Sequence, residues 1–315
     1  MPTSVRSFAK INIGLQIGSR RADGFHDLRT LYTTIALHDH ITVEVGDGDA
    51  IELFCSDSRV PLDASNTCHR AANLALKALN HRAHVRITIK KHLPVQGGLG
   101  AGSSNAIATI FALERALNQQ LPAKARAQIA AEIGSDLNLF LYGGLVLGTG
   151  RGEEVWPLVD LPSMPLVIVT PEVGISTPKA FAAWDALTDP AGSATMNKFD
   201  HSVYEWLSST VTSGVPALSG NRAEALLLDL VRTGISNDFE RVVFPEIPVL
   251  REVKCALERE GAAYASLSGS GSTLYGLFRS TADAKRAAER LTASGMKAVA
   301  TTTLPREPYW QRMFE

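Results

Sequence analysis

The stretch PVQGGLGAGSSNA, residues 94–106, has four glycines within six positions and continues into the apolar helical pattern IATIFALERAL. Glycine loses more backbone entropy on folding than any other residue, so mere flexibility does not explain so many of them. A helix that begins near Ser103 presents unpaired N–H groups and a partial positive charge at its N-terminus. Glycines before it let a bulky anion approach the backbone, and the hydroxyls of Ser103 and Ser104 offer further donors. The stretch therefore predicts a phosphate-binding loop without a lysine.

Other glycine motifs fit these residues less well. A Walker A loop requires lysine where Ser103 stands, and a dinucleotide-binding GxGxxG loop requires glycine there. The segment GSSNA matches the GxSxG turn of serine hydrolases only in part, because Ala106 replaces the second glycine. A flexible surface loop whose serine caps the following helix is the remaining alternative.

Composition predicts an ordinary globular protein of about two domains. The 315 residues are 45% hydrophobic and 20% charged, with a formal net charge of −1. This balance indicates neither a nucleic-acid partner nor an anionic membrane surface, and we find no apolar run typical of a membrane span or signal peptide. The three cysteines, far apart in the chain, suggest neither disulfides nor a zinc site, so we expect a reduced, cytoplasmic protein.

Hydrophobic periodicity predicts mixed strands and helices in the first half of the chain. Alternating apolar residues predict strands at 11–17, 29–37, 41–45, 51–54, 85–89, 143–147 and 155–158. Helical spacing is found at 66–79, 103–117, 123–133 and, in a shorter form, 137–141.

The second half has a different organisation. A buried strand is expected at 166–170, a polar loop at 188–200 and a strand–loop–strand within 263–278. Helices are predicted at 178–187, 202–208, 222–230, 247–260 and 282–294, and a last strand at 297–303. The closing β-loop-β-α-β order predicts a compact α+β unit, separated from the first half near residues 159–165.

Four segments resemble the motifs of one kinase family, in the family's order. Residues 94–106 are similar to the phosphate-binding motif of GHMP kinases, PxxxGLGSSAA, and SLSGSGSTLYGLF at 266–278 resembles their C-terminal glycine motif. AKINIGLQIGSRRADGFHDLRTLY at 9–32 and GSDLNLFLYGG at 134–144 resemble the branch of 4-diphosphocytidyl-2-C-methyl-D-erythritol kinases. Phe25 stands where that branch usually has tyrosine, and Asn138 where it has proline.

The resemblance implies a fold and an activity. The expected class is α+β, with a ribosomal-protein-S5-like β/α domain over residues 1–162 and a ferredoxin-like α+β domain over 163–315. The expected reaction moves the γ-phosphoryl group of ATP, with Mg²⁺, to the 2-hydroxyl of the methylerythritol unit, on the route to isoprenoids. The protein would act on a small molecule as a monomer or homodimer.

The resemblance also assigns catalytic and nucleotide-binding residues. Asp136 is expected to be the general base and Lys10 to stabilise negative charge. Asn12, two residues along the same strand, shares the face of Lys10 and is expected to orient the substrate or the base. Taken alone, a lysine near a strand end is usually solvated, and an aspartate at this position is most often a helix N-cap. The ATP phosphates are expected on Pro94, Gly97, Gly98, Leu99, Gly100, Ala101, Gly102, Ser103 and Ser104.

Two further groups are expected to hold the substrate. Phe25, His26 and Phe181 form the nucleobase set, although Phe181 also fits the core face of a helix. Gly269, Ser270 and Gly271 are expected to close over the substrate phosphates rather than to form a simple turn.

No magnesium ligand is identified by the sequence. Ser104 is one candidate, and no carboxylate stands out. The His38-Asp39-His40 run has the ligand types of a metal site, but no third ligand is nearby, and alternating residues at the start of a strand are more often solvated edge positions.

Three other functions remain open at this point. Another GHMP kinase, acting on homoserine, mevalonate or a sugar, would share the glycine loops but has no need of RRADGFH, residues 20–26. A non-catalytic nucleotide-binding module would not need both Lys10 and Asp136. A hydrolase that uses Ser104 is the least favoured.

Overall fold

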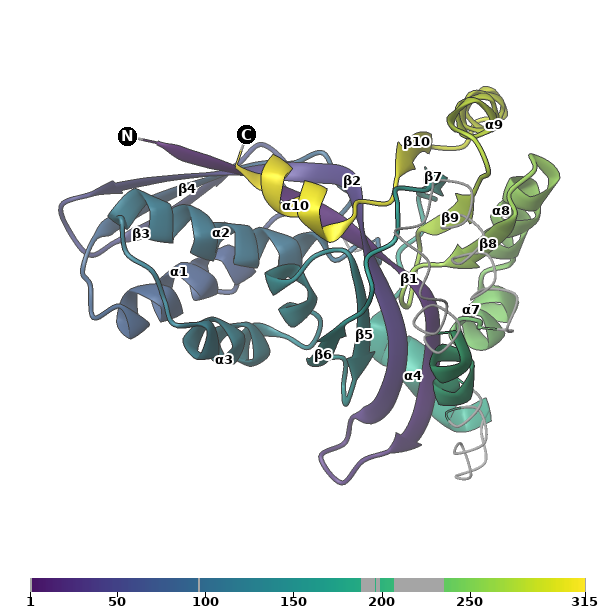
Figure 1. The fold of residues 1–315 in the computed structure, drawn as a ribbon, viewed down its shortest axis with the longest axis horizontal. Coiled ribbons are helices and arrows are strands. Elements are labelled where there is room, and N and C mark those ends of the chain that lie inside the picture. The colour runs from purple at the N-terminus through teal and green to yellow at the C-terminus, as the bar shows by residue number, and fades with distance from the viewer. Residues whose placement is uncertain (1, 96, 188–195, 197–198, 207–234, 315) are drawn as a thin grey trace, which may run out of the picture.

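The protein is built from two antiparallel-rich sheets, each packed against helices (Figure 1). The computed structural model describes residues 2–95, 97–187, 196, 199–206 and 235–314. The α+β class expected from the sequence is confirmed. Within this described part, no helix is both long and apolar enough to cross a membrane.

Two long strands connect the halves of the molecule. β1 (Thr3–Arg20) and β2 (His26–Gly46) form an antiparallel hairpin whose pairing shifts at three points, which allows it to bend. The sequence predicted separate strands at 29–37 and 41–45, but the structure joins them into β2. The hydrophobic residues of β1 enter the cores of both halves, so one strand fixes the two halves to each other.

The first sheet is completed on the free edge of β2. β4 pairs with the end of β2, β5 pairs with its beginning, and β3 and β6 extend the sheet outward. The bounds of these strands are Ile51–Cys55 for β3, His84–Lys90 for β4, Leu145–Thr149 for β5 and Glu154–Pro157 for β6. The packed helices are α1 (Thr67–Ala78), α2 (Ala101–Leu117) and α3 (Ala123–Ile133), with the 3₁₀ helix η1 (Asn138–Leu141).

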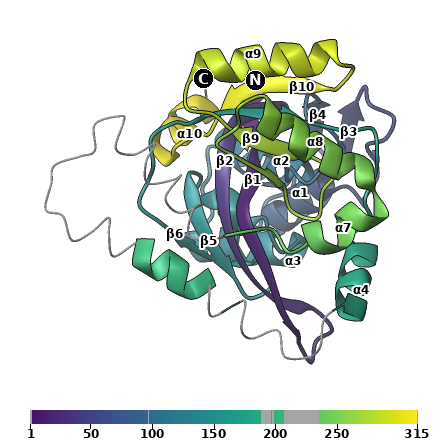
Figure 2. The same cartoon turned by 90° about the vertical axis from the view of Figure 1, so that its right-hand side faces the viewer.

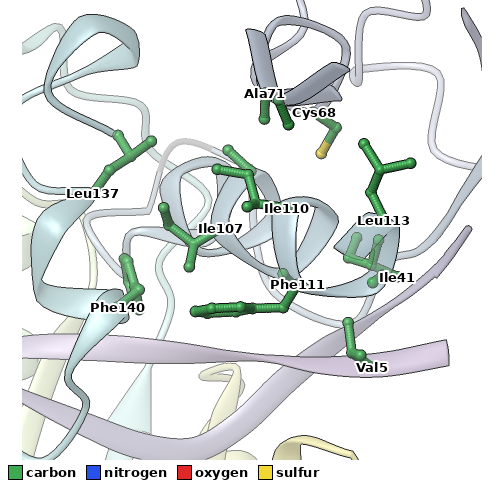
Figure 3. Packing of buried hydrophobic residues seen from close by; sticks show 14 of the residues in the cluster. Val5, Ile41, Cys68, Ala71, Ile107, Ile110, Phe111, Leu113, Leu137 and Phe140 are labelled. Carbon is green, nitrogen blue, oxygen red and sulfur yellow. The ribbon is translucent and has the colours of Figure 1, made fainter. Parts of the chain in front are cut away.

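Helix α2 is the centre of the first core. Its residues Ile107, Ile110 and Phe111 pack between the sheet and α1, as Figure 3 shows. Every residue of α2 from Ser104 to Glu114 is buried. The helix that follows the first glycine loop is therefore enclosed on several sides and cannot shift without disturbing the core.

The second sheet has the order β10-β7-β9-β8 and is packed against α8 and α9. Its strands are Pro165–Val169 (β7), Tyr264–Leu267 (β8), Leu274–Leu277 (β9) and Ala298–Thr302 (β10). The helices of this half are Thr177–Leu187 (α4), Glu240–Glu246 (α7), Pro248–Arg259 (α8) and Thr281–Ala293 (α9). The helix predicted at 222–230 and most of the loop predicted at 188–200 lie outside the described residues, whereas 199–206 is helical.

The end of the chain returns to the first half. Helix α10 (Arg306–Met313) was not predicted, and its buried Tyr309 donates a hydrogen bond to the carbonyl of Phe140 at 2.6 Å. Figures 1 and 2 both show the two chain ends close together beside α10. The boundary predicted near 159–165 thus falls between strands of different sheets, but the last helix packs on the first domain.

Replacement of Tyr309 by phenylalanine tests this return of the chain. The change removes the hydroxyl donor and leaves the Phe140 carbonyl buried without its partner. We expect the free energy of unfolding to fall by about 1–3 kcal/mol, measured by urea denaturation. Tyr204→Phe is the matched control, because Tyr204 is exposed. Equal stabilities of the two variants would contradict the role given to α10.

Candidate active site

The four sequence motifs meet around one cavity of about 990 Å³, a size typical of small-molecule sites. It lies where the β1–β2 hairpin, both glycine loops and α4 come together. Of the residues singled out from the sequence, the cavity is lined by Lys10, Asn12, Phe25, His26, Gly98, Gly100, Asp136, Phe181, Gly269, Ser270 and Gly271.

The first glycine loop enters α2 without a side-chain cap. The helix begins at Ala101, two residues earlier than predicted, and Gly100 occupies the cap position with a φ of 67°. The alternative of a serine N-cap is therefore wrong. The first helical hydrogen bond of the turn runs from the Ser104 N–H to the Gly100 carbonyl at 2.8 Å. The preceding N–H groups lack helical partners, which makes this terminus suitable for an anion.

The two glycine loops touch each other. Gly98 has a φ of 79°, and a Cβ on it would lie 2.2 Å from the carbonyl oxygen of Ser268. The Ser268 hydroxyl donates to the Gly98 carbonyl at 2.9 Å, and the Thr273 N–H donates to the Gly97 carbonyl at 3.1 Å. Only glycine fits at position 98, because the two backbones approach so closely there. Flexibility alone would not require such an approach.

The two serines after the loop have different partners. Ser103 donates its hydroxyl to Oδ1 of Asp136 at 2.6 Å. The Ser104 hydroxyl, predicted to face a phosphate or Mg²⁺, is buried and donates instead to the Phe8 carbonyl at 2.6 Å, with Ser7 as its second partner. That prediction is corrected by the geometry: one helical step turns Ser104 toward β1, where its hydroxyl joins α2 to the strand.

Lys10 is a buried cation beside a carboxylate. Its Nζ donates to Oδ1 of Asn12 at 2.7 Å, lies 3.9 Å from Oδ2 of Asp136 and sits 5.5 Å above the centre of the Tyr32 ring. Burial lowers the pKa of Lys10, and the charge of Asp136 opposes that shift. The alternative of a solvated surface lysine is wrong, since only 4% of the residue is exposed.

Hydrogen bonds orient the side chains of Asn12 and Asp136 toward Lys10. The Asn12 amide donates to Thr30 at 2.8 Å, which directs its carbonyl oxygen toward the amine, and Thr30 in turn donates to the Gly14 carbonyl. Asp136 caps no helix, because the short helix η1 that follows it has no side-chain cap. The carboxylate is therefore positioned between the Ser103 hydroxyl and the Lys10 amine.

The expected nucleobase residues line the same cavity. His26 is buried, and its ring stacks on Phe181 with centroids 5.1 Å apart and planes within 7°. Phe25 is exposed at the hairpin turn, with the guanidinium of Arg151 4.9 Å from the centre of its ring. Phe181 also contacts Phe239, so it serves the hydrophobic core and the cavity at once.

Sequence reasoning missed other residues of the cavity. Arg20, Arg151 and Asp185 also line it. A signal for Asp185 was present, because it follows Phe181 by four positions on a predicted helix and therefore shares its face. The position of Arg151 depends on the pairing of β5 with β6, which the sequence does not reveal.

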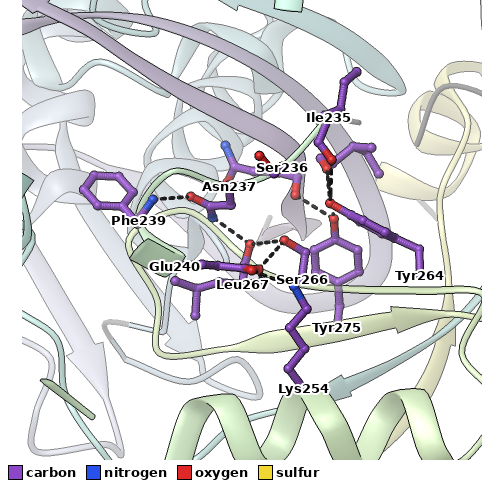
Figure 4. A network of polar contacts seen from close by, with 12 residues as sticks. Ile235, Ser236, Asn237, Phe239, Glu240, Lys254, Tyr264, Ser266, Leu267 and Tyr275 are labelled. Atoms are coloured by element: carbon purple, nitrogen blue, oxygen red, sulfur yellow. Dashed lines mark hydrogen bonds and ion pairs between the residues drawn. The ribbon is translucent and has the colours of Figure 1, made fainter. Parts of the chain in front are cut away.

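The second glycine loop is held by a buried polar network (Figure 4). The side-chain amide of Asn237 donates to the carbonyls of Leu267 and Gly269, each at 2.8 Å. Glu240 accepts from the Leu267 N–H at 2.9 Å and from Lys254 at 2.6 Å. Neither Asn237 nor Glu240 was identified from the sequence, because their partners are separated from them along the chain and meet them only in the folded protein.

The His38-Asp39-His40 run is no metal site. Asp39 is fully buried and accepts from Lys91 at 2.6 Å and from Asn105 at 3.0 Å. The rings of His38 and His40 pack edge to face. Throughout the residues placed by the structure, no group of three or more His, Cys, Asp or Glu side chains is arranged to hold a metal ion.

Comparison with known proteins finds relatives from the GHMP kinase family, and these relatives match most of the chain. The model of the GHMP kinases N terminal domain matches residues 66–144, and that of the GHMP kinases C terminal matches 221–297. A 4-diphosphocytidyl-2-C-methyl-D-erythritol kinase of Solibacter usitatus is 36% identical over 287 residues, 91% of this chain and 84% of that protein. One from Prosthecochloris aestuarii is 37% identical over 295 residues, 92% of this chain and 94% of that protein.

Solved structures show the same fold. A crystal structure of 4-(cytidine 5'-diphospho)-2C-methyl-D-erythritol kinase superposes with a TM-score of 0.71 at 30% identity, covering 95% of this chain and 98% of that one. A homoserine kinase from Cytophaga hutchinsonii has a TM-score of 0.73 at 20% identity, covering 98% and 96%, and supports the fold alone.

Replacement of Gly98 by alanine tests the contact between the glycine loops. The added Cβ meets the Ser268 carbonyl and the positive φ is unfavourable for alanine, so we expect a loss of about 2–4 kcal/mol in the free energy of unfolding. Gly102→Ala, in the first turn of α2, is the control, because a Cβ there would lie 3.7 Å from Thr67, an ordinary contact. Urea denaturation of both variants measures the effect. A Gly98→Ala protein as stable as the control would contradict the close approach.

Proposed function

The chain belongs to the 4-diphosphocytidyl-2-C-methyl-D-erythritol kinases, a branch of the GHMP kinases, and from this membership we infer its reaction. It transfers the γ-phosphoryl group of ATP to the 2-hydroxyl of 4-diphosphocytidyl-2-C-methyl-D-erythritol, in the methylerythritol phosphate route to isopentenyl diphosphate. The observation that carries this inference is the meeting, in one cavity, of the first glycine loop, the Lys10–Asp136 pair and the His26–Phe181 stack.

We propose that the ATP phosphates bind at the N-terminus of α2. The unpaired N–H groups there, together with the helix dipole, favour negative charge. The carbonyls of Gly97, Gly98 and Leu99 are already bonded to other parts of the chain, which holds the loop in one shape before the nucleotide arrives. The Ser104 hydroxyl has no part in this proposal, since it is bonded to Phe8.

Asp136 and Lys10 would carry out the chemistry of transfer. Phosphoryl transfer requires mainly positioning and charge neutralisation, with a base to accept the proton of the attacking hydroxyl. Asp136 would accept that proton, and the Ser103 hydroxyl would hold its carboxylate in orientation. The Lys10 ammonium would stabilise the developing negative charge on the hydroxyl oxygen and the γ-phosphate. Asn12 and Thr30 would fix the position of the amine.

Mg²⁺ would accompany ATP. This ion is usually held by phosphates, water and one or two carboxylates rather than by a cage of protein ligands, which agrees with the absence of a metal cluster among the described residues. The Ser103 hydroxyl, beside the first glycine loop, and the Asp136 carboxylate bonded to it are two oxygens that could ligate the ion. When bound, the ion would neutralise charge on the β- and γ-phosphates.

The substrate would extend along the cavity. Its cytosine would lie near Phe25, His26 and Phe181, and its 2-hydroxyl near Lys10 and Asp136. Arg20 and Arg151 line the same cavity and have the charge to attract its diphosphate. The loop formed by Gly269, Ser270 and Gly271 would cover the phosphates from the second domain. The cytoplasmic location and the monomer or homodimer expected from the sequence stay predictions.

A coupled ADP-release assay tests the reaction. Mg-ATP is supplied with 4-diphosphocytidyl-2-C-methyl-D-erythritol and, in parallel, with homoserine, mevalonate and galactose. We expect turnover with the cytidylylated alcohol alone. Turnover with another alcohol would contradict the substrate, and ATP binding without any turnover would favour a non-catalytic nucleotide-binding module.

Asp136→Asn tests the general base. The amide keeps the size of the side chain but cannot accept the proton, so kcat should fall by about 10²- to 10⁴-fold while KM for ATP changes little. Asp47→Asn is the control, because Asp47 is exposed in the turn after β2. An unaltered kcat in the Asp136 variant would remove this residue from the mechanism.

The lowered pKa of Lys10 predicts a pH dependence. Activity needs the protonated amine, so kcat should decline as pH rises, at a pH below the ordinary lysine pKa of about 10.4. For stability the sign is opposite: burying the ammonium costs free energy at neutral pH, and that cost disappears once the amine is neutral in both the folded and the unfolded states. Lys10→Met should lose activity at pH 7, because methionine carries no ammonium group. A kcat that is constant up to pH 10.4 would contradict the assignment.

A further inference from the structure

Asp185 is an acidic residue of the cavity that the reaction described above does not use. It lies on α4, one turn after Phe181, and its Oδ1 is 2.6 Å from Nε2 of His26. Its Oδ2 is 4.0 Å from a guanidinium nitrogen of Arg20. The carboxylate thus reaches from the second domain to the His26 ring at the start of β2, where the nucleobase is expected.

A carboxylate in this position selects the tautomer of His26. An ionised carboxylate only accepts hydrogen bonds, so Nε2 of His26 must carry the proton that it shares with Asp185. In the neutral ring Nδ1 is then an acceptor. Among the described residues, Nδ1 of His26 has no hydrogen-bonding partner. Stacking on Phe181 fixes the plane in which this acceptor points.

We propose that Asp185 is a positioning residue that holds Nδ1 of His26 as an acceptor for the exocyclic amino group of cytosine, so that the cavity selects cytosine over uracil. The proposal rests on the function inferred above and names the specificity determinant of the same site. Cytosine carries an N4 amino donor at the position where uracil has a carbonyl acceptor. With uracil, two acceptors face each other, and a buried acceptor without a donor is unfavourable.

A purely structural role for Asp185 makes a different prediction. If the contact only fastened α4 to the hairpin, its loss would lower stability and weaken all ligands of the cavity equally. A tautomer-setting role changes the preference between two bases of the same shape. The ratio of affinities for CDP and UDP isolates this preference, because the two nucleotides share ribose and phosphates.

Calorimetric titration of CDP and UDP into wild-type protein, Asp185→Asn and Asp185→Glu provides the test. An asparagine amide both donates and accepts, so it allows either tautomer of His26. We expect the wild type to bind CDP roughly 10- to 100-fold more tightly than UDP, and the ratio to approach one in Asp185→Asn. Asp185→Glu retains an acceptor-only group and should restore part of the preference. Asp200→Asn is the matched control: Asp200 pairs with Arg29 of β2 and does not line the cavity.

Kinetics and stability separate the outcomes. With the cytidylylated alcohol, Asp185→Asn should raise KM while kcat at saturation stays within about threefold, since Asp185 contacts His26 and Arg20 and makes no contact with Lys10 or Asp136. An unchanged CDP/UDP ratio in Asp185→Asn, or a lower Tm with both affinities reduced equally, overturns the proposal. A wild type that shows no turnover but binds CDP preferentially would overturn the inferred reaction and leave the tautomer argument standing.

Discussion

The contact between the two glycine loops is the constraint on which the rest of the site depends. Gly98 and Ser268 belong to different halves of the chain and approach so closely that no side chain fits between them. β1 makes this approach possible, because its residues pack into the cores of both halves and its Lys10 N–H donates to the Leu99 carbonyl at 3.0 Å. The first glycine loop, at the N-terminus of the buried helix α2, is thereby placed against the second glycine loop, which Asn237 holds through two hydrogen bonds.

Lys10 is a buried cation that lines the same cavity. Taking an ammonium group out of water is unfavourable, and one carboxylate at 3.9 Å compensates for this only in part, as the direction of the pKa shift of Lys10 indicates. The hydrogen bonds from Lys10 to Asn12 and from Asn12 to Thr30 keep the amine from turning toward solvent. Perturbed groups of this kind are concentrated at functional sites, and here the group faces a cavity large enough for a nucleotide-linked substrate.

Much of the site was predictable because its signals are local. The glycines of residues 94–106 indicate a loop with special backbone requirements, and Gly98 has one. The bounds of α3 agree with the helical spacing at 123–133. Lys10 and Asn12 share a face because strand residues alternate. The family resemblance supplied what spacing does not, namely that Lys10 and Asp136 meet.

What the sequence did not reveal depends on packing between distant residues. Ser103 and Ser104 are neighbours, yet one bonds Asp136 and the other Phe8, which follows from how α2 is turned against β1. The packing of α10 on the first domain and the hydrogen bonds of Asn237 likewise join residues that are distant in sequence and meet only in the folded core.

The position and number of phosphates in the product test the central claim most directly. ³¹P NMR of the wild-type reaction with Mg-ATP and 4-diphosphocytidyl-2-C-methyl-D-erythritol follows every phosphorus atom at once. The account predicts one new phosphomonoester on the erythritol unit for each ADP formed, with the substrate diphosphate intact. Inorganic phosphate appearing with ADP while the substrate is unchanged would contradict it, because the cavity would then deliver the phosphoryl group to water.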